Sequence, residues 1–306
     1  MPLLVLVGPT ATGKTGLAIA LARRLNGEIV SADSRQIYKG MDIGTAKPTA
    51  EQRALVHHHL LDIIAPDTSY TLAEYQAAAQ AAIAAIHERG RLPLLVGGTG
   101  LYIRAVVDNL AIPEVAPQWE LRRELEARAE REGAAALHAR LAALDPASAA
   151  SIDPRNLRRV IRALEVCLTT GRPFSEQQGA RPSPYRPLLL GLTCERALLY
   201  RRADQRVDAM LAAGLIAEVR RLVAEGYAWN LPAMTSLGYS EIGAYLCGES
   251  TLEQAVERLK LNTHSYIRRQ HTWFRPDTRI HWLDSCAADL EARALALIKP
   301  WLDGIP

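Results

Sequence analysis

The sequence predicts an α/β protein with a parallel β-sheet at its centre and a mainly helical insertion. Three short apolar runs are typical of fully buried strands: residues 3–7, 92–96 and 188–192. Segments with helical spacing separate these runs, and strands that alternate with helices form parallel sheets. Charged, alanine-rich helical sequence interrupts the alternation after Pro113. We therefore expect a core of residues 1–112 and 188–306 and a helical insertion domain of residues 113–187.

The first apolar run leads directly into a phosphate-binding sequence. Residues 8–15 read GPTATGKT and match the pattern G-x-x-x-x-G-K-[ST]. In such a loop the backbone N–H groups and the following helix N-terminus face an anion. Lys14 would reach the phosphate oxygens, and the Thr15 hydroxyl would bind Mg²⁺. The sequence thus predicts a polyphosphate site formed by Gly8, Pro9, Thr10, Ala11, Thr12, Gly13, Lys14 and Thr15.

A second strand, residues 28–33, ends at Asp33. In open α/β sheets the ligand crevice lies at the C-terminal ends of the strands, so we expect Asp33 to lie near Thr15. Two polar loops follow, at 34–40 and 42–48.

A helix is predicted over 70–89, with Thr71 and Glu74 as a capping box. The strand after it ends in Gly97-Gly98-Thr99-Gly100. Nucleotide-hydrolysing proteins of this fold usually have an Mg²⁺-binding aspartate at this point. Its absence weakens an ATPase or kinase interpretation, and the glycines permit close approach of the backbone to a bulky ligand.

The insertion carries a patterned basic segment. Arg155, Arg158, Arg159 and Arg162 follow the i, i+3, i+4, i+7 spacing of one helix face, and Val160 and Ile161 can serve the buried side. Between Arg155 and Arg206 eleven arginines oppose four acidic residues, a net charge of +7 in a chain whose total is +3. These residues leave two alternatives open, which are contact with a nucleic-acid backbone and salt bridges to acidic residues of 120–132.

The remaining sequence predicts a helix over 198–226 with a break near Gly214, a glycine-containing loop at 235–239, a basic helix over 251–274, a strand at 280–283 and a last helix over 289–302.

The composition excludes some classes of protein and indicates the cellular compartment. No apolar run is long enough to span a membrane. The four cysteines are scattered without a C-x-x-C pair, which argues against zinc and a disulfide framework, so we expect a cytoplasmic protein.

Taken together, these segments resemble the bacterial tRNA dimethylallyltransferases, also called tRNA isopentenyltransferases. The resemblance covers essentially the whole chain. Seven motifs carry it: GPTATGKT at 8–15, DSRQIYKGMDIGTAKP at 33–48, HHLLDI at 58–63, LLVGGTGLY at 94–102, RALEV at 162–166, LGY at 237–239 and RRQHTWFR at 268–275. It implies a P-loop NTPase-like core and the transfer of a dimethylallyl group from its diphosphate to N6 of adenosine 37 in tRNA, giving i6A37 and free diphosphate.

The resemblance also implies roles for individual residues. The phosphate loop would bind dimethylallyl diphosphate with Mg²⁺ on Thr15, Arg220 would steady the diphosphate, and Asp33 would be the general base. The insertion domain would bind the tRNA anticodon stem-loop, and the protein would act as a monomer. The residues expected to contact tRNA are Asp33, Ser34, Arg35, Gln36, Thr99, Arg122, Arg158, Arg159, Val160, Ile161, Arg162, Thr235, Ser236, Leu237, Gly238 and Tyr239.

Two other classes of function remain possible from the sequence. One is an isopentenyltransferase or a kinase that acts on free adenine nucleotides, which would not need an arginine face on the insertion. The other is a non-catalytic RNA-binding NTPase module, against which the missing acidic residue after the third strand argues.

Overall fold

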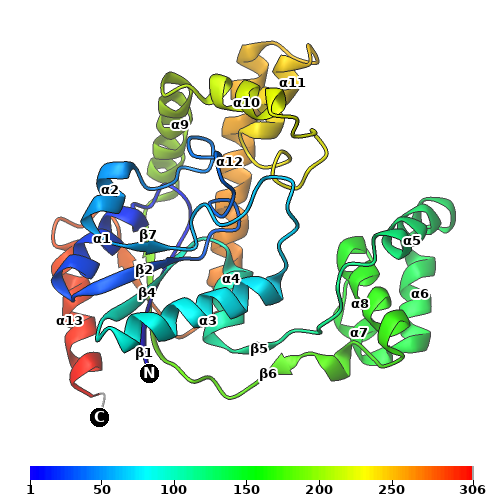
Figure 1. The fold of residues 1–306 in the computed structure, drawn as a ribbon, viewed down its shortest axis with the longest axis horizontal. Helices are drawn as coiled ribbons and strands as arrows, with labels where there is room; N and C mark the ends of the chain where they lie inside the picture. The colour runs from blue at the N-terminus through cyan, green and yellow to red at the C-terminus, as the bar shows by residue number, and fades with distance from the viewer. Residues whose placement is uncertain (305–306) are drawn as a thin grey trace. The chain divides into compact units, whose positions relative to one another are not determined.

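The computed structural model describes residues 1–304 and divides into two compact units (Figure 1). The first comprises Met1–Val107 and the chain from Pro184 onward, and the second comprises Asp108–Ser183. The structure thus divides the chain a few residues before positions 113 and 187. No helix among residues 1–304 has the length and apolar character needed to cross a bilayer.

A six-stranded parallel sheet forms the centre of the first unit, with the strand order β3-β2-β4-β1-β7-β8. The strands are β1 (Pro2–Val7), β2 (Gly27–Ser31), β3 (His58–His59), β4 (Leu92–Gly97), β7 (Arg186–Thr193) and β8 (Ile280–Asp284). The central strands are apolar because helices cover both faces of the sheet. This confirms the predicted α/β class.

Side chains alternate between two cores along the central strands. Leu3, Val5 and Val7 of β1 pack with α3 (Leu72–Glu88) and α4 (Gly100–Val107) on one face. Leu4 and Leu6 pack with α1 (Lys14–Arg24) and α13 (Leu290–Asp303) on the other. The predicted capping box of α3 is present, since the Thr71 side chain accepts from the Glu74 N–H and Glu74 accepts from the Thr71 N–H.

A further group of helices lies beyond the C-terminal ends of the strands (Figure 1). It contains α9 (Arg196–Ala212), α10 (Leu215–Ala224), α11 (Tyr239–Leu246) and the long α12 (Leu252–Phe274); the short α2 (Ala50–Leu55) precedes β3. The predicted break near Gly214 is confirmed, because this left-handed glycine is the N-cap of α10. Helices α9 and α12 are joined by a hydrogen bond between His264 and Asp204 (2.8 Å) and by an ion pair between Lys260 and Asp208 (2.6 Å).

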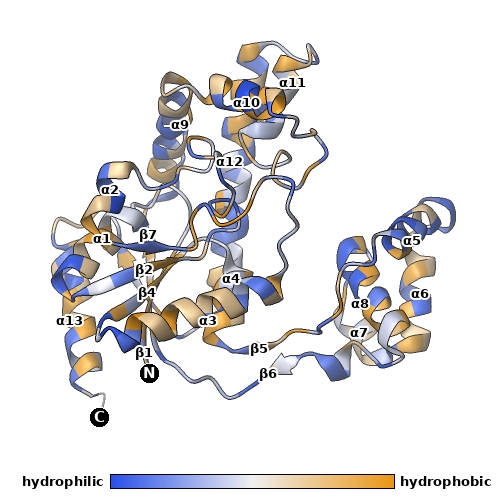
Figure 2. Ribbon diagram, in the orientation of Figure 1, coloured by the Kyte–Doolittle hydropathy of each residue, from blue (hydrophilic) through white to orange (hydrophobic). Residues whose placement is uncertain are grey.

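The second unit is helical. Its elements are β5 (Leu110–Ala111), α5 (Trp119–Glu132), α6 (Ala134–Leu144), α7 (Pro146–Ser151), α8 (Leu157–Thr170), the 3-10 turn η1 (Ser175–Gln177) and β6 (Gly179–Ala180). Helices α5, α6 and α8 are amphipathic (Figure 2), and their apolar residues, among them Leu125, Leu141 and Leu164, form a separate core. Strands β5 and β6 pair antiparallel where the chain enters and leaves the unit.

Candidate active site at the C-terminal edge of the sheet

The phosphate loop between β1 and α1 has a backbone that only certain residues adopt. Gly8 and Gly13 have φ angles of 141° and 83°, and Ala11 is also left-handed with φ 64°. A Cβ on Gly8 would lie 2.5 Å from the Leu192 carbonyl oxygen of β7, so a glycine is required there. The buried Thr12 hydroxyl donates to the Pro9 carbonyl (2.8 Å). The loop is therefore shaped before any ligand arrives.

Lys14 lies at the start of α1 with its ammonium group turned into this loop. Its Nζ donates to the Pro9 carbonyl oxygen (2.7 Å). Burial lowers the pKa of Lys14 to about 7, and the nearby positive charge of Arg206 adds to that shift, while Asp33 opposes it. Such a site favours an anionic ligand, because the negative charge of the ligand compensates both the burial of the Lys14 ammonium and its repulsion by Arg206.

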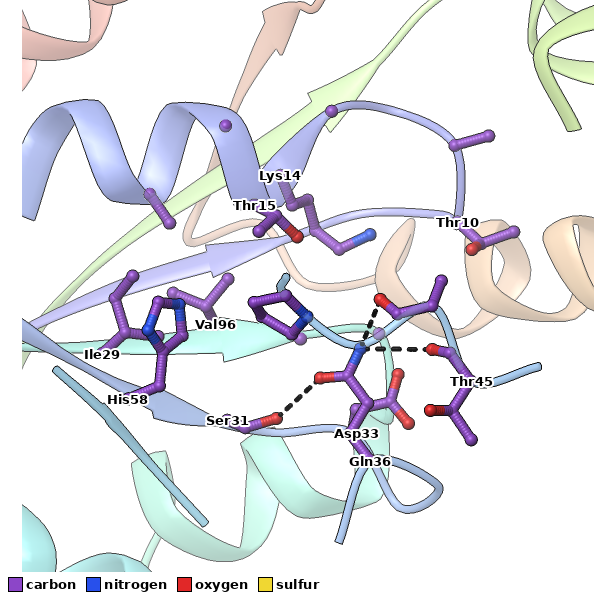
Figure 3. A pocket seen from close by; sticks show the side chains of 18 of the residues that line it. Thr10, Lys14, Thr15, Ile29, Ser31, Asp33, Gln36, Thr45, His58 and Val96 are labelled. Atoms are coloured by element: carbon purple, nitrogen blue, oxygen red, sulfur yellow. Dashed lines mark hydrogen bonds between the residues drawn. The ribbon is translucent and has the colours of Figure 1, made fainter. Parts of the chain in front are cut away.

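A cavity of about 290 Å³ opens beside the loop. Figure 3 shows Lys14 and Thr15 on one side of it and Asp33 and Gln36 on the opposite side. The apolar side chains of Ala18, Ile29, Leu61 and Val96 also line the cavity, and His58 lies beside Ile29 (Figure 3). The cavity thus combines an anion-binding loop, a carboxylate and several apolar side chains.

Asp33 follows β2, at the edge where the crevice of an α/β sheet is expected. Its Oδ1 accepts from the Arg35 N–H (2.9 Å), and Oδ2 has no partner among the described residues. The next residue, Ser34, donates its N–H to the Thr99 hydroxyl (3.0 Å). The loops after β2 and β4 therefore meet beside the carboxylate.

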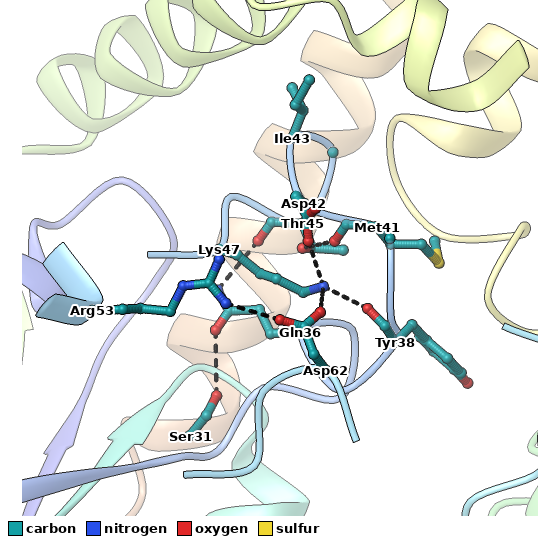
Figure 4. Close-up of polar contacts among 12 residues, drawn as sticks. Ser31, Gln36, Tyr38, Met41, Asp42, Ile43, Thr45, Lys47, Arg53 and Asp62 are labelled. Atoms are coloured by element: carbon teal, nitrogen blue, oxygen red, sulfur yellow. Dashed lines mark hydrogen bonds and ion pairs between the residues drawn. The ribbon is translucent and has the colours of Figure 1, made fainter. Parts of the chain in front are cut away.

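Gln36 is held by three groups around its side-chain amide. Its Nε2 donates to the carbonyl oxygens of Thr45 (3.3 Å) and Ala46 (3.2 Å), and its Oε1 accepts from the Ser31 hydroxyl (3.3 Å). Figure 4 shows how the loop that supplies these carbonyls is supported by the buried Lys47, whose ammonium donates to the Tyr38 carbonyl (2.5 Å), to Asp42 (2.7 Å) and to Asp62.

Glu218 of α10 supports the same loop from outside the cavity. Its carboxylate accepts three consecutive backbone N–H groups, from Asp42 (2.9 Å), Ile43 (2.9 Å) and Gly44 (3.1 Å). The Tyr239 hydroxyl donates to it as well (2.6 Å). Sequence reasoning did not find Glu218, because the contact joins segments that lie far apart in the chain.

Arg220, which the sequence predicts to steady a diphosphate, does not line the cavity. It is exposed on α10, whose buried face consists of Leu215, Glu218, Val219 and Leu222. The arginine in the cavity is Arg206 of α9, which donates to the Thr10 hydroxyl (3.1 Å). Burial lowers the pKa of Arg206. The helical spacing of α9 would have predicted an inward position for Arg206, because Arg206 lies three residues after the buried Ala203 and so on the same helix face.

Tyr266 and Gln270, both on α12, also line the cavity and were not among the predicted residues. Burial raises the pKa of Tyr266, whose hydroxyl interacts with Thr99, so this side chain stays neutral. Tyr266 and Gln270 are spaced i and i+4, which places them on one helix face. This spacing is the only feature of the sequence that indicates a shared position for the two side chains.

In the loop before α11, three of the five residues predicted to contact RNA are buried. Tyr239 is fully buried, with its hydroxyl on Glu218, and Ser236 is buried with its hydroxyl on the Ala233 carbonyl (2.6 Å). Gly238 is buried too, and its N–H donates to Glu241 (2.8 Å). Thr235 is exposed and Leu237 is partly exposed, so only these two offer side chains to a ligand in this structure.

The four arginines of the second unit that the sequence predicts to contact tRNA divide into two groups. Arg122 and Arg162 both pair with the buried Glu165, Arg122 through two bonds of 2.7 and 2.8 Å and Arg162 through one of 2.6 Å. Burial alone would raise the pKa of Glu165, but these two arginines hold it below the usual value. Arg158 and Arg159 are exposed and have no partner among residues 1–304.

The RNA contacts predicted for Val160 and Ile161 are not of the side-chain kind in this structure. Both side chains are buried in the core of the second unit, at 0% and 5% exposure, so contact at these two positions would have to be made by the backbone. Arg155 lies before the first turn of α8 and forms an ion pair with Asp153 (2.6 Å). The arginine face therefore reduces to Arg158 and Arg159.

Two places offer ligands to a metal ion. The Thr15 hydroxyl lines the cavity and has no partner among the described residues, which fits a cation bound together with phosphate oxygens. Elsewhere, Glu28, His57 and His59 have ligand atoms within 4.8 Å of one another. The Glu28 carboxylate already binds Arg89 (2.7 Å) and Arg91 (3.0 Å), and these positive charges oppose a cation there.

Comparison with known proteins agrees with this architecture. The family model described as IPP transferase matches residues 36–277, and one described as isopentenyl transferase matches residues 1–63. A tRNA dimethylallyltransferase of Roseiflexus sp. (strain RS-1) is 54% identical over 303 residues, 99% of each chain. One of Chloroflexus aurantiacus (strain ATCC 29366 / DSM 635 / J-10-fl) is 57% identical over 273 residues, 89% of this chain and 92% of the other.

Solved structures are similar as well. The tRNA isopentenylpyrophosphate transferase of Bacillus halodurans has a TM-score of 0.72 and 44% identity, covering 99% of this chain and 96% of that one. A eukaryotic dimethylallyltransferase, described as acting on tRNA, has a TM-score of 0.84 and 27% identity, covering 100% of this chain and 81% of that one.

Proposed function

This chain belongs to the tRNA dimethylallyltransferase family, and we propose that its cavity transfers a dimethylallyl group from dimethylallyl diphosphate to N6 of adenosine 37 in tRNA. The chain is thus a prenyltransferase that modifies tRNA. One observation carries the detailed proposal: a phosphate loop and a carboxylate, Asp33, face the same cavity, while the intervening strand ends in glycines in place of an acidic residue. This arrangement suits an anionic leaving group and a proton acceptor.

The diphosphate of the donor would lie in the phosphate loop. Backbone N–H groups, Lys14 and Arg206 would stabilise the negative charge that grows on the bridging oxygen as the carbon–oxygen bond breaks. Mg²⁺ held by the Thr15 hydroxyl and phosphate oxygens would supply further charge neutralisation. The apolar side chains of Ala18, Ile29 and Val96 in the cavity lining suit the hydrocarbon part of the donor.

Asp33 would act as the general base. The adenine exocyclic amine is a weak nucleophile, because its lone pair is delocalised into the ring. As the nitrogen lone pair forms a bond to the allylic carbon, the carbon–oxygen electrons pass to the diphosphate and an N6 proton passes to the free Oδ2 of Asp33. Such proton transfer contributes about 10²–10⁴ in rate. The base must leave its stack to reach the cavity, which costs a few kcal/mol.

The second unit would bind the anticodon stem-loop through Arg158 and Arg159, the exposed and unpaired arginines of α8. Cations of this kind contact phosphate oxygens and fix the register of the RNA without reading its sequence. We also propose that the protein acts as a monomer. The tRNA substrate points to a cytoplasmic enzyme.

Labelled dimethylallyl diphosphate, incubated with tRNA or with AMP, tests the reaction. We expect label on tRNA, and label on AMP alone would instead indicate a nucleotide isopentenyltransferase. Asp33→Ala should lower kcat about 10²–10⁴-fold with little change in donor KM. A raised donor KM with normal kcat would make Asp33 a binding residue and contradict its role as base.

A further inference from the structure

Gln270 of α12 joins two loops at the edge of the sheet through its side-chain amide. Its Oε1 accepts from the backbone N–H of Thr10 (2.9 Å), in the phosphate loop after β1. Its Nε2 donates to the carbonyl oxygen of Gly98 (3.1 Å), in the loop after β4. Gln270 is 5% exposed; its bond to Gly98 is buried and its bond to Thr10 is partly buried. This amide therefore ties the two loops together beyond Val7 and Gly97, where the pairing of β1 with β4 ends.

The packing around this amide leaves little freedom. A Cβ on Gly98 would lie 2.2 Å from Nε2, so the amide reaches the carbonyl only because residue 98 is a glycine. Thr10 is held a second time through its hydroxyl, which accepts from Arg206 (3.1 Å). Arg206 and Gln270 come from α9 and α12, which the Lys260–Asp208 ion pair and the His264–Asp204 hydrogen bond hold together. The first bend of the phosphate loop is thus attached to both helices.

In the proposed function the two loops contact different substrates, the prenyl donor and the acceptor adenosine. The phosphate loop would hold the leaving diphosphate. The loop after β4 continues from Gly98 to Thr99, whose hydroxyl accepts from the Ser34 N–H (3.0 Å), beside Asp33. A continuous set of hydrogen bonds therefore runs from Thr10 through Gln270 to the segment that carries the base.

We propose that Gln270 is a positioning residue that sets the distance between the diphosphate site and the acceptor site. This rests on the proposed function of the cavity. Displacement at the allylic carbon requires the nitrogen, the carbon and the leaving oxygen to be aligned, and a misplacement of about 1 Å costs about 10²-fold in rate. Loss of the amide leaves the Thr10 N–H and the Gly98 carbonyl without partners and lets the loops separate, while the groups assigned to hold each substrate remain.

The Gln270→Met variant tests this, since methionine has a similar length and forms neither bond. The matched control is Gln254→Met, the same substitution in the first turn of α12, where Gln254 forms a capping box with Thr251 outside the cavity. We expect Gln270→Met to lower kcat about 10²-fold, with the KM values for dimethylallyl diphosphate and tRNA changed less than about threefold. The control should keep kcat within about twofold of the wild type.

Thermal unfolding of both variants separates positioning from folding. A kcat within about threefold of wild type in folded Gln270→Met would overturn the proposal, and so would KM values that rise as much as kcat falls. In Gln270→Glu the carboxylate still accepts from Thr10 but cannot donate to Gly98, so kcat should stay low; recovery to the wild-type kcat would show that the Gly98 bond is irrelevant. Failure of the wild type to label tRNA would instead refute the proposed function.

Discussion

The pKa of Lys14, lowered to about 7 in the ligand-free protein, predicts that donor binding takes up a proton. Burial is the main cause of the shift, and repulsion from Arg206 adds to it. A bound diphosphate reverses both effects, because its negative charge favours the ammonium form, so the pKa should rise again. The free protein is then about nine-tenths protonated at Lys14 at pH 6 and about one-tenth protonated at pH 8.

The size of the effect follows from these fractions. Binding should take up about 0.9 proton at Lys14 at pH 8 but only about 0.1 at pH 6. The Kd for the donor should rise about tenfold per pH unit above pH 7, in addition to any titration of the ligand itself. The direction is fixed by the lowered pKa: a lysine that is neutral before binding must gain a proton, so raising the pH weakens binding.

Titration calorimetry in two buffers of different ionisation enthalpy measures the proton uptake directly, with inorganic diphosphate as the probe. The control is Lys14→Arg, since arginine keeps the positive charge but does not titrate in this range, so the difference between the two proteins belongs to Lys14. Equal proton uptake by the wild type and by Lys14→Arg at pH 8 would refute the reasoning.

Two further predictions concern the arginines. Arg206→Met should raise donor KM and lower kcat together, by about 10²-fold in kcat/KM, whereas Arg220→Met should leave both within about twofold, and steady-state kinetics with dimethylallyl diphosphate compares them. A larger loss of kcat/KM in Arg220→Met than in Arg206→Met would instead support the diphosphate-binding role predicted for Arg220. The double variant Arg158→Ala and Arg159→Ala should weaken tRNA binding and reduce the slope of log K against log salt by about 2. An unchanged slope would place both arginines away from the RNA.

The parts of the fold that depend on local patterns could be predicted from the sequence. Short apolar runs identified β1, β4 and β7, and the capping box of α3 follows from Thr71 and Glu74 alone. The phosphate loop is equally local, since its glycines and its lysine occupy fixed positions along eight residues. These features depend on backbone geometry and periodicity, which a sequence displays directly.

Residue roles that depend on distant contacts were harder to predict. The RNA contacts assigned to Val160 and Ile161 came from a family segment, although the spacing of α8 already placed both on its buried side. Arg162 turns inward because the buried Glu165, one turn later, accepts from it as well as from Arg122. Gln270 and Glu218 bind backbone groups more than a hundred residues away, and no local pattern reports such bonds.

The β5–β6 ribbon has a consequence for how the chain folds. Strand β7 must pair with β1 across more than a hundred residues, a contact of the kind that slows folding. The ribbon brings Leu110 and Ala180 together, so a folded second unit removes the chain between them, somewhat less than half of the chain that separates β1 from β7, from the loop that must close. Each doubling of loop length costs about 0.6 kcal/mol of closure entropy. Early formation of the helical unit would therefore lower the closure cost of the β1–β7 pairing by somewhat less than about 0.6 kcal/mol.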